Sequence, residues 1–91
     1  MPPPIYLPDG AYPLAPRGTM VFDLNTAQGQ DSVSVTNDTD HDGAQYKISL
    51  NHGAYQTHGL DSGESDNYDE NDATHYHIDN IGAVALVVDI A

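Results

Sequence analysis

The chain contains no cysteine and no tryptophan, and only Arg17 and Lys47 among its 91 residues are basic. Without cysteine, neither a disulfide, nor a thiolate metal site, nor a cysteine nucleophile can form. The two basic residues are outnumbered by 14 acidic ones, which gives a formal net charge of -12. Because nucleic acids and anionic lipids are bound through clustered Lys and Arg, we expect neither as a partner. No apolar run is long enough for membrane insertion.

The excess of acidic residues must be offset, because self-repulsion destabilises a compact chain. High salt, bound divalent cations or a basic partner could each do this. A chain of 91 residues forms one domain and buries only about 60–65% of its unfolded surface, so the margin of stability is small. Scarce Lys and abundant Asp suit a halophilic protein in a high-salt environment. Composition alone does not show whether salt, bound cations or a basic partner offsets the charge.

Proline is confined to the beginning of the chain, where all 6 copies fall within the first 16 residues. Proline donates no backbone hydrogen bond, so this segment is excluded from a helix and from a central strand. We predict an extended, proline-rich N-terminal arm over residues 1–18. It has no basic start and no continuous apolar run, so we do not expect a secretion signal.

The arm is too apolar to remain in water without a binding surface. Two interpretations stay open: the arm folds back over an edge of its own domain, or it binds a neighbouring subunit or another protein partner. The candidate partner-binding residues are Ile5, Tyr6, Leu7, Tyr12 and Leu14.

From residue 19 onward, apolar residues recur at every second position in short segments separated by turn residues. Such alternation with a turn signal every 8–12 residues or so is typical of antiparallel sheets, and no window has a helical period. We therefore predict one all-β domain over residues 19–91. It is a small antiparallel β-sandwich or barrel, Ig-like or jelly-roll-like, with six or seven short strands.

The last segment, residues 82–91, is apolar on both faces of an extended strand, and only Asp89 interrupts the pattern. A strand of this kind is normally covered on both sides. We expect it at the centre of a sheet, with other layers packed against both faces.

Residues 38–43 match the first half of a calcium-binding loop, with Asp38, Asp40 and Asp42 at alternate positions before a glycine. An EF-hand is rejected, because Ser49 stands where the bidentate Glu is needed and helices are not expected on either side. Two interpretations remain: a looser calcium site in a β-hairpin, or a solvated acidic turn. Calcium is therefore a candidate cofactor.

A second acidic stretch follows at residues 61–72. Its members repel one another, so we expect a mobile, hydrated loop. If the loop is instead ordered, a bound ion is the simplest means of holding it. The six acidic residues are Asp61, Glu64, Asp66, Asp69, Glu70 and Asp72.

His75 and His77 lie on one face of a predicted strand, about 6.6 Å apart along it, with Asp79 on the same face. Both could reach one zinc or nickel ion. A similar pair occurs in β-barrel oxygenases, but the carboxylate and glycine pattern that follows it there is absent here. The alternatives are ordinary polar strand residues or histidines at a subunit contact.

No nucleophile elbow, phosphate-binding loop or dinucleotide fingerprint occurs in the sequence, so we expect no enzyme. The expected function is structural: a virion decoration (cement) protein, or a subunit of an extracellular fibre or surface layer, docking through its arm. Its expected location is the virion surface or the extracellular space, within a homo-oligomer, a capsid or a fibre lattice. The alternative is a calcium- or glycan-binding β-sandwich module.

Overall fold

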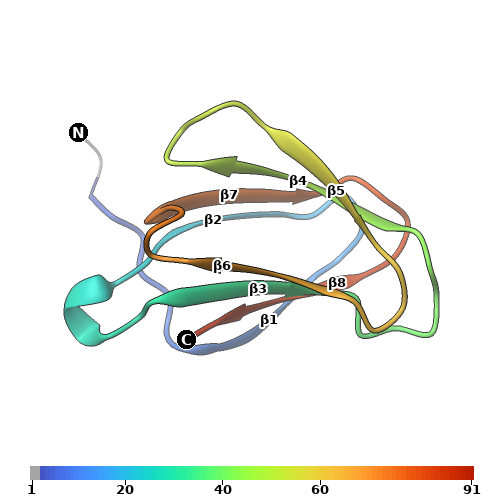
Figure 1. Cartoon of the computed structure of the whole chain (residues 1–91), viewed down its shortest axis with the longest axis horizontal. Helices are drawn as coiled ribbons and strands as arrows, with labels where there is room; N and C mark the ends of the chain where they lie inside the picture. Colours follow the sequence, from blue (N-terminus) through green and yellow to red (C-terminus); the bar gives the residue numbers. More distant parts are fainter. Residues whose placement is uncertain (1–2) are drawn as a thin grey trace.

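The computed structural model describes residues 3–91 and consists almost entirely of β-strands (Figure 1). Its one helical segment within these residues is a short 3₁₀-helix at Thr26–Gln28, which is too short to cross a bilayer. The strands are β1 (Gly10–Leu14), β2 (Thr19–Asp23), β3 (Ser32–Thr36), β4 (Ala44–Leu50), β5 (Gln56–Leu60), β6 (Ser65–Asp69), β7 (His75–Asn80) and β8 (Leu86–Ile90).

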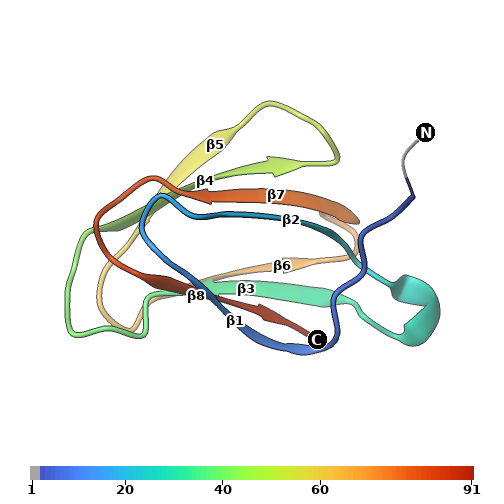
Figure 2. The ribbon, with the colours of Figure 1, turned by 180° about the vertical axis from the view of Figure 1, so that it is seen from behind.

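The strands form two four-stranded sheets that lie face to face, and every pair is antiparallel. One sheet has the order β1-β8-β3-β6 and the other has the order β2-β7-β4-β5. Only the β4–β5 hairpin stays within one sheet, because every other connection crosses to the opposite layer, as Figures 1 and 2 show. The predicted all-β sandwich is confirmed, but the predicted count of six or seven strands is wrong, because the described residues form eight.

The core lies between the sheets and is built from every second residue of the strands. Phe22 and Tyr76, whose side chains are fully buried, stack with ring centroids 5.3 Å apart and join β2 to β7. Full burial stabilises each large apolar side chain by roughly 1.5–3 kcal/mol. The core residues are Leu14, Phe22, Leu24, Val33, Val35, Ala44, Tyr46, Ile48, Leu60, Ala73, Tyr76, Ile78, Leu86, Val88 and Ile90.

Strand β8 lies between β1 and β3, so the predicted central position is confirmed. Its predicted coverage on both faces is wrong. Leu86, Val88 and Ile90 are buried against the other sheet, whereas Val87 is half-buried and Asp89 is exposed. A two-layer sandwich covers only one face of each sheet, and the outer face remains in solvent.

The predicted extended, proline-rich arm over residues 1–18 is not shown. Gly10–Leu14 form β1, which pairs with β8 and places Pro13 opposite Val87. The position is possible because β1 is an edge strand, where a missing N–H can face away from the sheet. The part of the predicted arm that precedes the sandwich is residues 3–9, and Met1 and Pro2 lie outside the described residues.

The predicted mobile loop at residues 61–72 is wrong for its central part, because Ser65–Asp69 form β6 and pair with β3. The half-buried Asp66 and Tyr68 alternate with exposed residues along this strand. The Tyr46 hydroxyl donates a hydrogen bond to the Asp66 carboxylate and lies 2.7 Å from the Tyr68 hydroxyl. A carboxylate at an inward position is tolerated because a buried hydroxyl satisfies it.

Candidate functional site

The outer face of the β2-β7-β4-β5 sheet carries a group of histidines. Alternation along β7 turns Tyr76 and Ile78 into the core and leaves His75 and His77 on the outside. The antiparallel register places Val21 opposite His77, and Asp23 opposite His75. We call this surface the histidine face and define it as Val21, Asp23, His52, His75, His77 and Asp79.

Residues 3–9, which we call the N-terminal segment, run along one end of the sandwich from this sheet to the other (Figures 1 and 2). Tyr6 forms a parallel bridge with Asp23 at the end of β2. The Ile5 N–H donates to Asp23 Oδ2 at 2.9 Å, and the Asp23 N–H donates to the Ile5 carbonyl at 2.7 Å. The segment therefore adds a single bridge to the edge of β2.

Gln30 holds the other end of the N-terminal segment. Its side chain is 6% exposed, and its Nε2 donates to the Leu7 carbonyl at 2.7 Å and to Asp9 Oδ1 at 3.0 Å. The Gln30 Oε1 accepts from the Asn25 N–H at 2.9 Å. Of the two interpretations left open for the arm, contact with its own domain is thus observed, and contact with a neighbour remains a proposal.

A cavity of about 610 Å³ lies between the N-terminal segment and the histidine face. Ile5, which lines this cavity, and the next residue, Tyr6, which does not, stay 49% and 50% exposed although both are tethered to the domain. A solvent-facing apolar pair next to a hollow is a feature of interaction sites. The lining residues are Pro3, Pro4, Ile5, Val21, Asp23, His52, His75 and His77.

Both carboxylates of the histidine face are engaged. Asp23 Oδ1 lies 2.8 Å from His75 Nδ1 while its other oxygen accepts from Ile5. Asp79 accepts from the Thr19 hydroxyl at 2.6 Å and lies 3.7 Å from Lys47 Nζ and 3.4 Å from His77 Nε2. These contacts give both carboxylates polar partners, and the Asp79 charge lies beside the Lys47 ammonium group.

The environment of Asp23 lowers its pKa. Burial acts in the opposite sense and is the largest single influence, but the Ile5 N–H bond and the hydrogen bond and charge of His75 together outweigh it. The ionised form of Asp23 is therefore favoured in the folded chain.

Two neighbours of the histidines were not identified from the sequence. The His52 ring stacks on His75 at 3.9 Å, and the Tyr55 hydroxyl lies 2.9 Å from His77 Nδ1. Both come from the β4–β5 connection, where Asn51 and His52 adopt positive φ angles. The side of the sheet on which their side chains fall depends on the pairing of β4 with β7.

The structure does not assemble the metal site considered for His75 and His77. Within residues 3–91, no group of three or more His, Asp or Glu side chains is placed to hold a metal ion. His75 Nδ1 is hydrogen-bonded to the Asp23 carboxylate, and His77 Nδ1 is hydrogen-bonded to the Tyr55 hydroxyl. The two histidines lie on one strand face with Asp79, as predicted, but they bind separate partners.

The candidate calcium ligands are not brought together either. Asp38 and Asp40 are exposed in the β3–β4 connection. Asp42 Oδ1 accepts from the Ser62 N–H at 2.9 Å, so this carboxylate joins two loops. The preceding Asn37 is fully buried and fixes the loop through hydrogen bonds.

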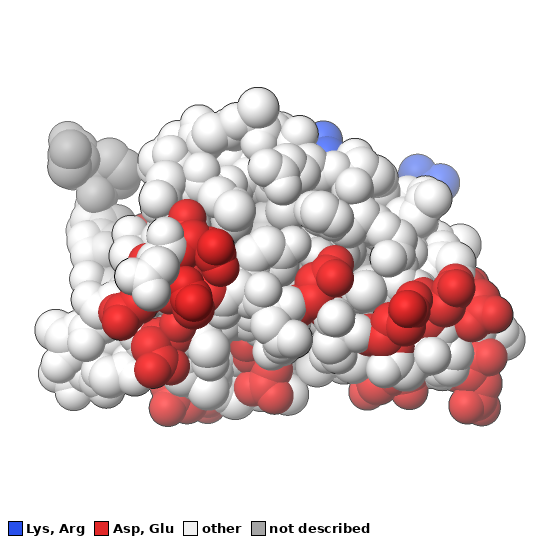
Figure 3. Space-filling model, in the orientation of Figure 1, with Lys and Arg blue, Asp and Glu red and all other residues white. Residues whose placement is uncertain are grey.

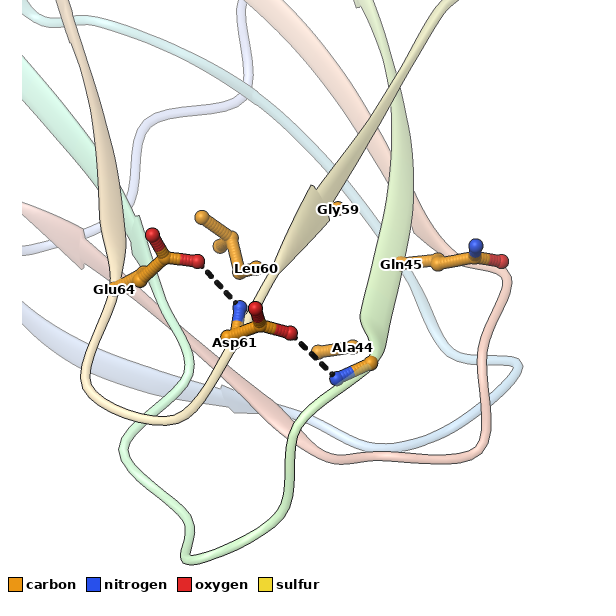
Figure 4. Close-up of a pocket in the computed structure, with 7 residues that line it drawn as sticks. Ala44, Gln45, Gly59, Leu60, Asp61 and Glu64 are labelled. Carbon is orange, nitrogen blue, oxygen red and sulfur yellow. Dashed lines mark hydrogen bonds between the residues drawn. The ribbon is translucent and has the colours of Figure 1, made fainter.

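A second cavity, of about 320 Å³, lies where β4 and β5 meet the acidic loops (Figure 4). Asp61 Oδ1 accepts from the Gly43 N–H at 3.2 Å, and Glu64 Oε1 accepts from the Asp61 N–H at 2.7 Å. These carboxylates hold the loop backbone, and the arrangement has a structural role.

Replacing Asp23 with Asn should destabilise the domain by about 1–2 kcal/mol at pH 7, because a charge-assisted hydrogen bond is lost. The lowered pKa of Asp23 means that its contribution is present above the unfolded value of 3.8 and is lost as the pH falls through the folded value. The difference between wild type and Asp23→Asn in urea unfolding should therefore shrink with acidification below pH 4. Asp89→Asn, at an exposed site, is the control and should change stability by less than about 0.5 kcal/mol. A difference that stays constant down to pH 2 would contradict this account.

No protein-family model matches the chain, and no curated protein matches it significantly. The case for a function therefore depends on the N-terminal segment, the histidine face and the cavity between them.

Proposed function

We propose that the chain is a non-enzymatic structural protein that joins an assembly through its N-terminal segment and histidine face. The observation that carries the proposal is the half-exposed pair Ile5 and Tyr6, of which Ile5 lines a largely apolar hollow. A monomer that functions alone gains nothing from leaving these side chains in water, whereas a partner that covers them gains roughly 25 cal/mol for each Å² buried.

The strand order supports a structural role. The orders β1-β8-β3-β6 and β2-β7-β4-β5 are those of an eight-stranded jelly roll. Jelly rolls build viral capsid and lectin domains, although a fold alone does not fix a function. The finer proposal is a virion decoration protein, or a subunit of an extracellular fibre or surface layer, in a high-salt environment that screens the net charge of -12.

Catalysis is less well supported. Asp23 and His75 form a carboxylate–imidazole pair beside the larger cavity. A nucleophile would have to complete it, and no Ser or Thr hydroxyl among the described residues is hydrogen-bonded to His75. The pair instead fixes the N-terminal segment, because the second Asp23 oxygen holds Ile5.

Gradient sedimentation of material from the natural source, followed by immunodetection, tests the proposal. The chain should be recovered in particles far heavier than its 9.8 kDa monomer. A variant with Tyr6→Ser, expressed in the same source, should shift towards the free fraction. Recovery of the wild-type chain only as a free monomer would contradict an assembly role.

A further inference from the structure

We infer that the partner at this surface is a second copy of the chain. Two copies pair around a two-fold axis, and Ile5 and Tyr6 of each copy enter the hollow between the other copy's N-terminal segment and histidine face. This inference rests on the proposed function and names the partner at the same site.

The shape of the surface favours a two-fold contact. In such a contact the same patch serves both partners, so it must contain both a projecting group and the hollow that receives it. Here the two are adjacent: Ile5 and Tyr6 are about half exposed, and Ile5 lines the cavity of about 610 Å³. The walls of this cavity include Pro3, Pro4 and Val21, which offer apolar contact to an incoming side chain.

The distribution of charge also favours the histidine face as the contact between two copies. Two chains with a net charge of -12 repel each other over most of their surfaces. In Figure 3 the acidic side chains cover mainly the lower part of the molecule, at the level of the β1-β8-β3-β6 sheet and the loops, and the basic side chains lie along the upper edge. The histidine face belongs to the upper sheet, and both of its carboxylates are bound by neighbouring groups.

Other exposed features fit a second copy less well. The smaller cavity contains Asp61 and Glu64, so two copies meeting there would bring like charges together. Ile81 is 44% exposed, but neither it nor its chain neighbours in the β7–β8 connection line either cavity described above. Tyr55 lies against Lys47 and His77 of its own chain.

Sedimentation velocity of the purified full chain, from about 1 to 500 µM in 0.15 M NaCl, measures the association directly. A concentration-dependent shift from monomer to dimer is expected. Raising NaCl to about 0.5 M should strengthen it, because screening weakens the residual repulsion between acidic surfaces while the apolar contact is retained.

The decisive variant is Ile5→Glu, with Ile81→Glu as the matched control. Both add one negative charge in place of an isoleucine of similar exposure, 49% against 44%. Ile5→Glu keeps the backbone hydrogen bonds to Asp23 and should weaken dimerisation at least tenfold, whereas Ile81→Glu should stay within about twofold of wild type. Tyr6→Ser removes a projecting side chain without adding charge and should also weaken dimerisation, which provides a second test if Ile5→Glu is poorly folded.

A wild-type chain that remains monomeric up to 500 µM would overturn the inference, as would equal weakening by Ile5→Glu and Ile81→Glu. If the chain is monomeric when pure but sediments in heavy particles from its source, the inference that the partner is a second copy is wrong, and the proposed assembly role is supported. If it is also a free monomer in its source, both proposals fail.

Discussion

The chain is expected to unfold as the pH rises from 10 to 12, with its free energy of unfolding falling by about 3 kcal/mol per pH unit in the upper part of that range. The cause is a set of tyrosine hydroxyls between the two sheets. Burial raises the pKa of Tyr46, and the neighbouring Asp66 and Tyr68 raise it further. Burial and the charges of Asp72 and Asp69 likewise raise the pKa of Tyr76.

The third member of this set, Tyr68, is only half-buried. Burial and the charges of Asp66 and Asp72 raise its pKa, while its hydrogen bond with Tyr46 has the opposite effect. A partly exposed group is screened by solvent, so Tyr68 should contribute less than the two fully buried rings.

The sign of the effect follows from proton binding. Tyrosine in an unfolded chain loses its proton near pH 10, and these hydroxyls keep theirs in the folded chain at higher pH. Above pH 10 the unfolded state therefore binds fewer protons, and stability falls with pH by up to about 1.4 kcal/mol per unit for each fully retained proton. The contribution is complete below pH 10 and is lost as the pH rises through the folded pKa values.

Circular dichroism and phenolate absorbance, followed together from pH 8 to 12.5, check this prediction. Part of the phenolate signal should appear only in the transition in which the β-sheet signal disappears. Tyr76→Phe keeps the ring that stacks on Phe22 and removes one titrating group, so its stability should depend less steeply on pH. Complete phenolate formation with an intact β-sheet signal would contradict the prediction.

The fold was predictable wherever side-chain alternation matched burial. Val33 and Val35, and Tyr76 and Ile78, alternate with polar residues and are all buried in the structure. The pattern failed at β6, where an inward position is filled by Asp66. The Asp66 carboxylate accepts a hydrogen bond from Tyr46, which lies 20 positions earlier in the chain. An argument from β-propensity counts Asp as unfavourable in a strand and does not include this distant partner.

The surface was predictable only in part. The spacing of His75 and His77 placed both on one strand face with Asp79, as the structure has them. Asp23 and His52 join them through the pairing of β2 with β7 and through the β4–β5 turn. Cross-strand register depends on the whole sheet, so a single sequence did not indicate which of 14 acidic residues would face a histidine.

Replacing Asn37 is expected to cost the domain more stability than any surface change. Its fully buried side chain makes hydrogen bonds in three directions. The Nδ2 group donates to the His41 carbonyl at 2.7 Å and to the Leu60 carbonyl at 3.1 Å. The Oδ1 atom accepts from the Thr39 hydroxyl at 2.6 Å and from its N–H at 3.1 Å.

Asn37→Ala should lower the free energy of unfolding by about 2–4 kcal/mol, because it leaves buried polar groups without partners. Asn37→Asp has almost the same shape but places a carboxylate oxygen against two carbonyl oxygens, so its cost should be at least as large. Urea unfolding at pH 7 measures both, with Asn67→Ala as the matched control. Asn67 is exposed, its side chain accepts one hydrogen bond from Ser34, and its removal should cost less than about 0.5 kcal/mol.

The same variants separate the two interpretations of the acidic turn at residues 38–42. If the turn is a solvated loop held by Asn37, calcium should raise the melting temperature no more than sodium chloride at matched ionic strength does. If Asp38, Asp40 and Asp42 bind calcium once it is supplied, the ion should restore stability to Asn37→Ala by mass action. The hydrogen bonds of Asn37 to both sides of the turn, and the use of Asp42 by Ser62, favour the first result.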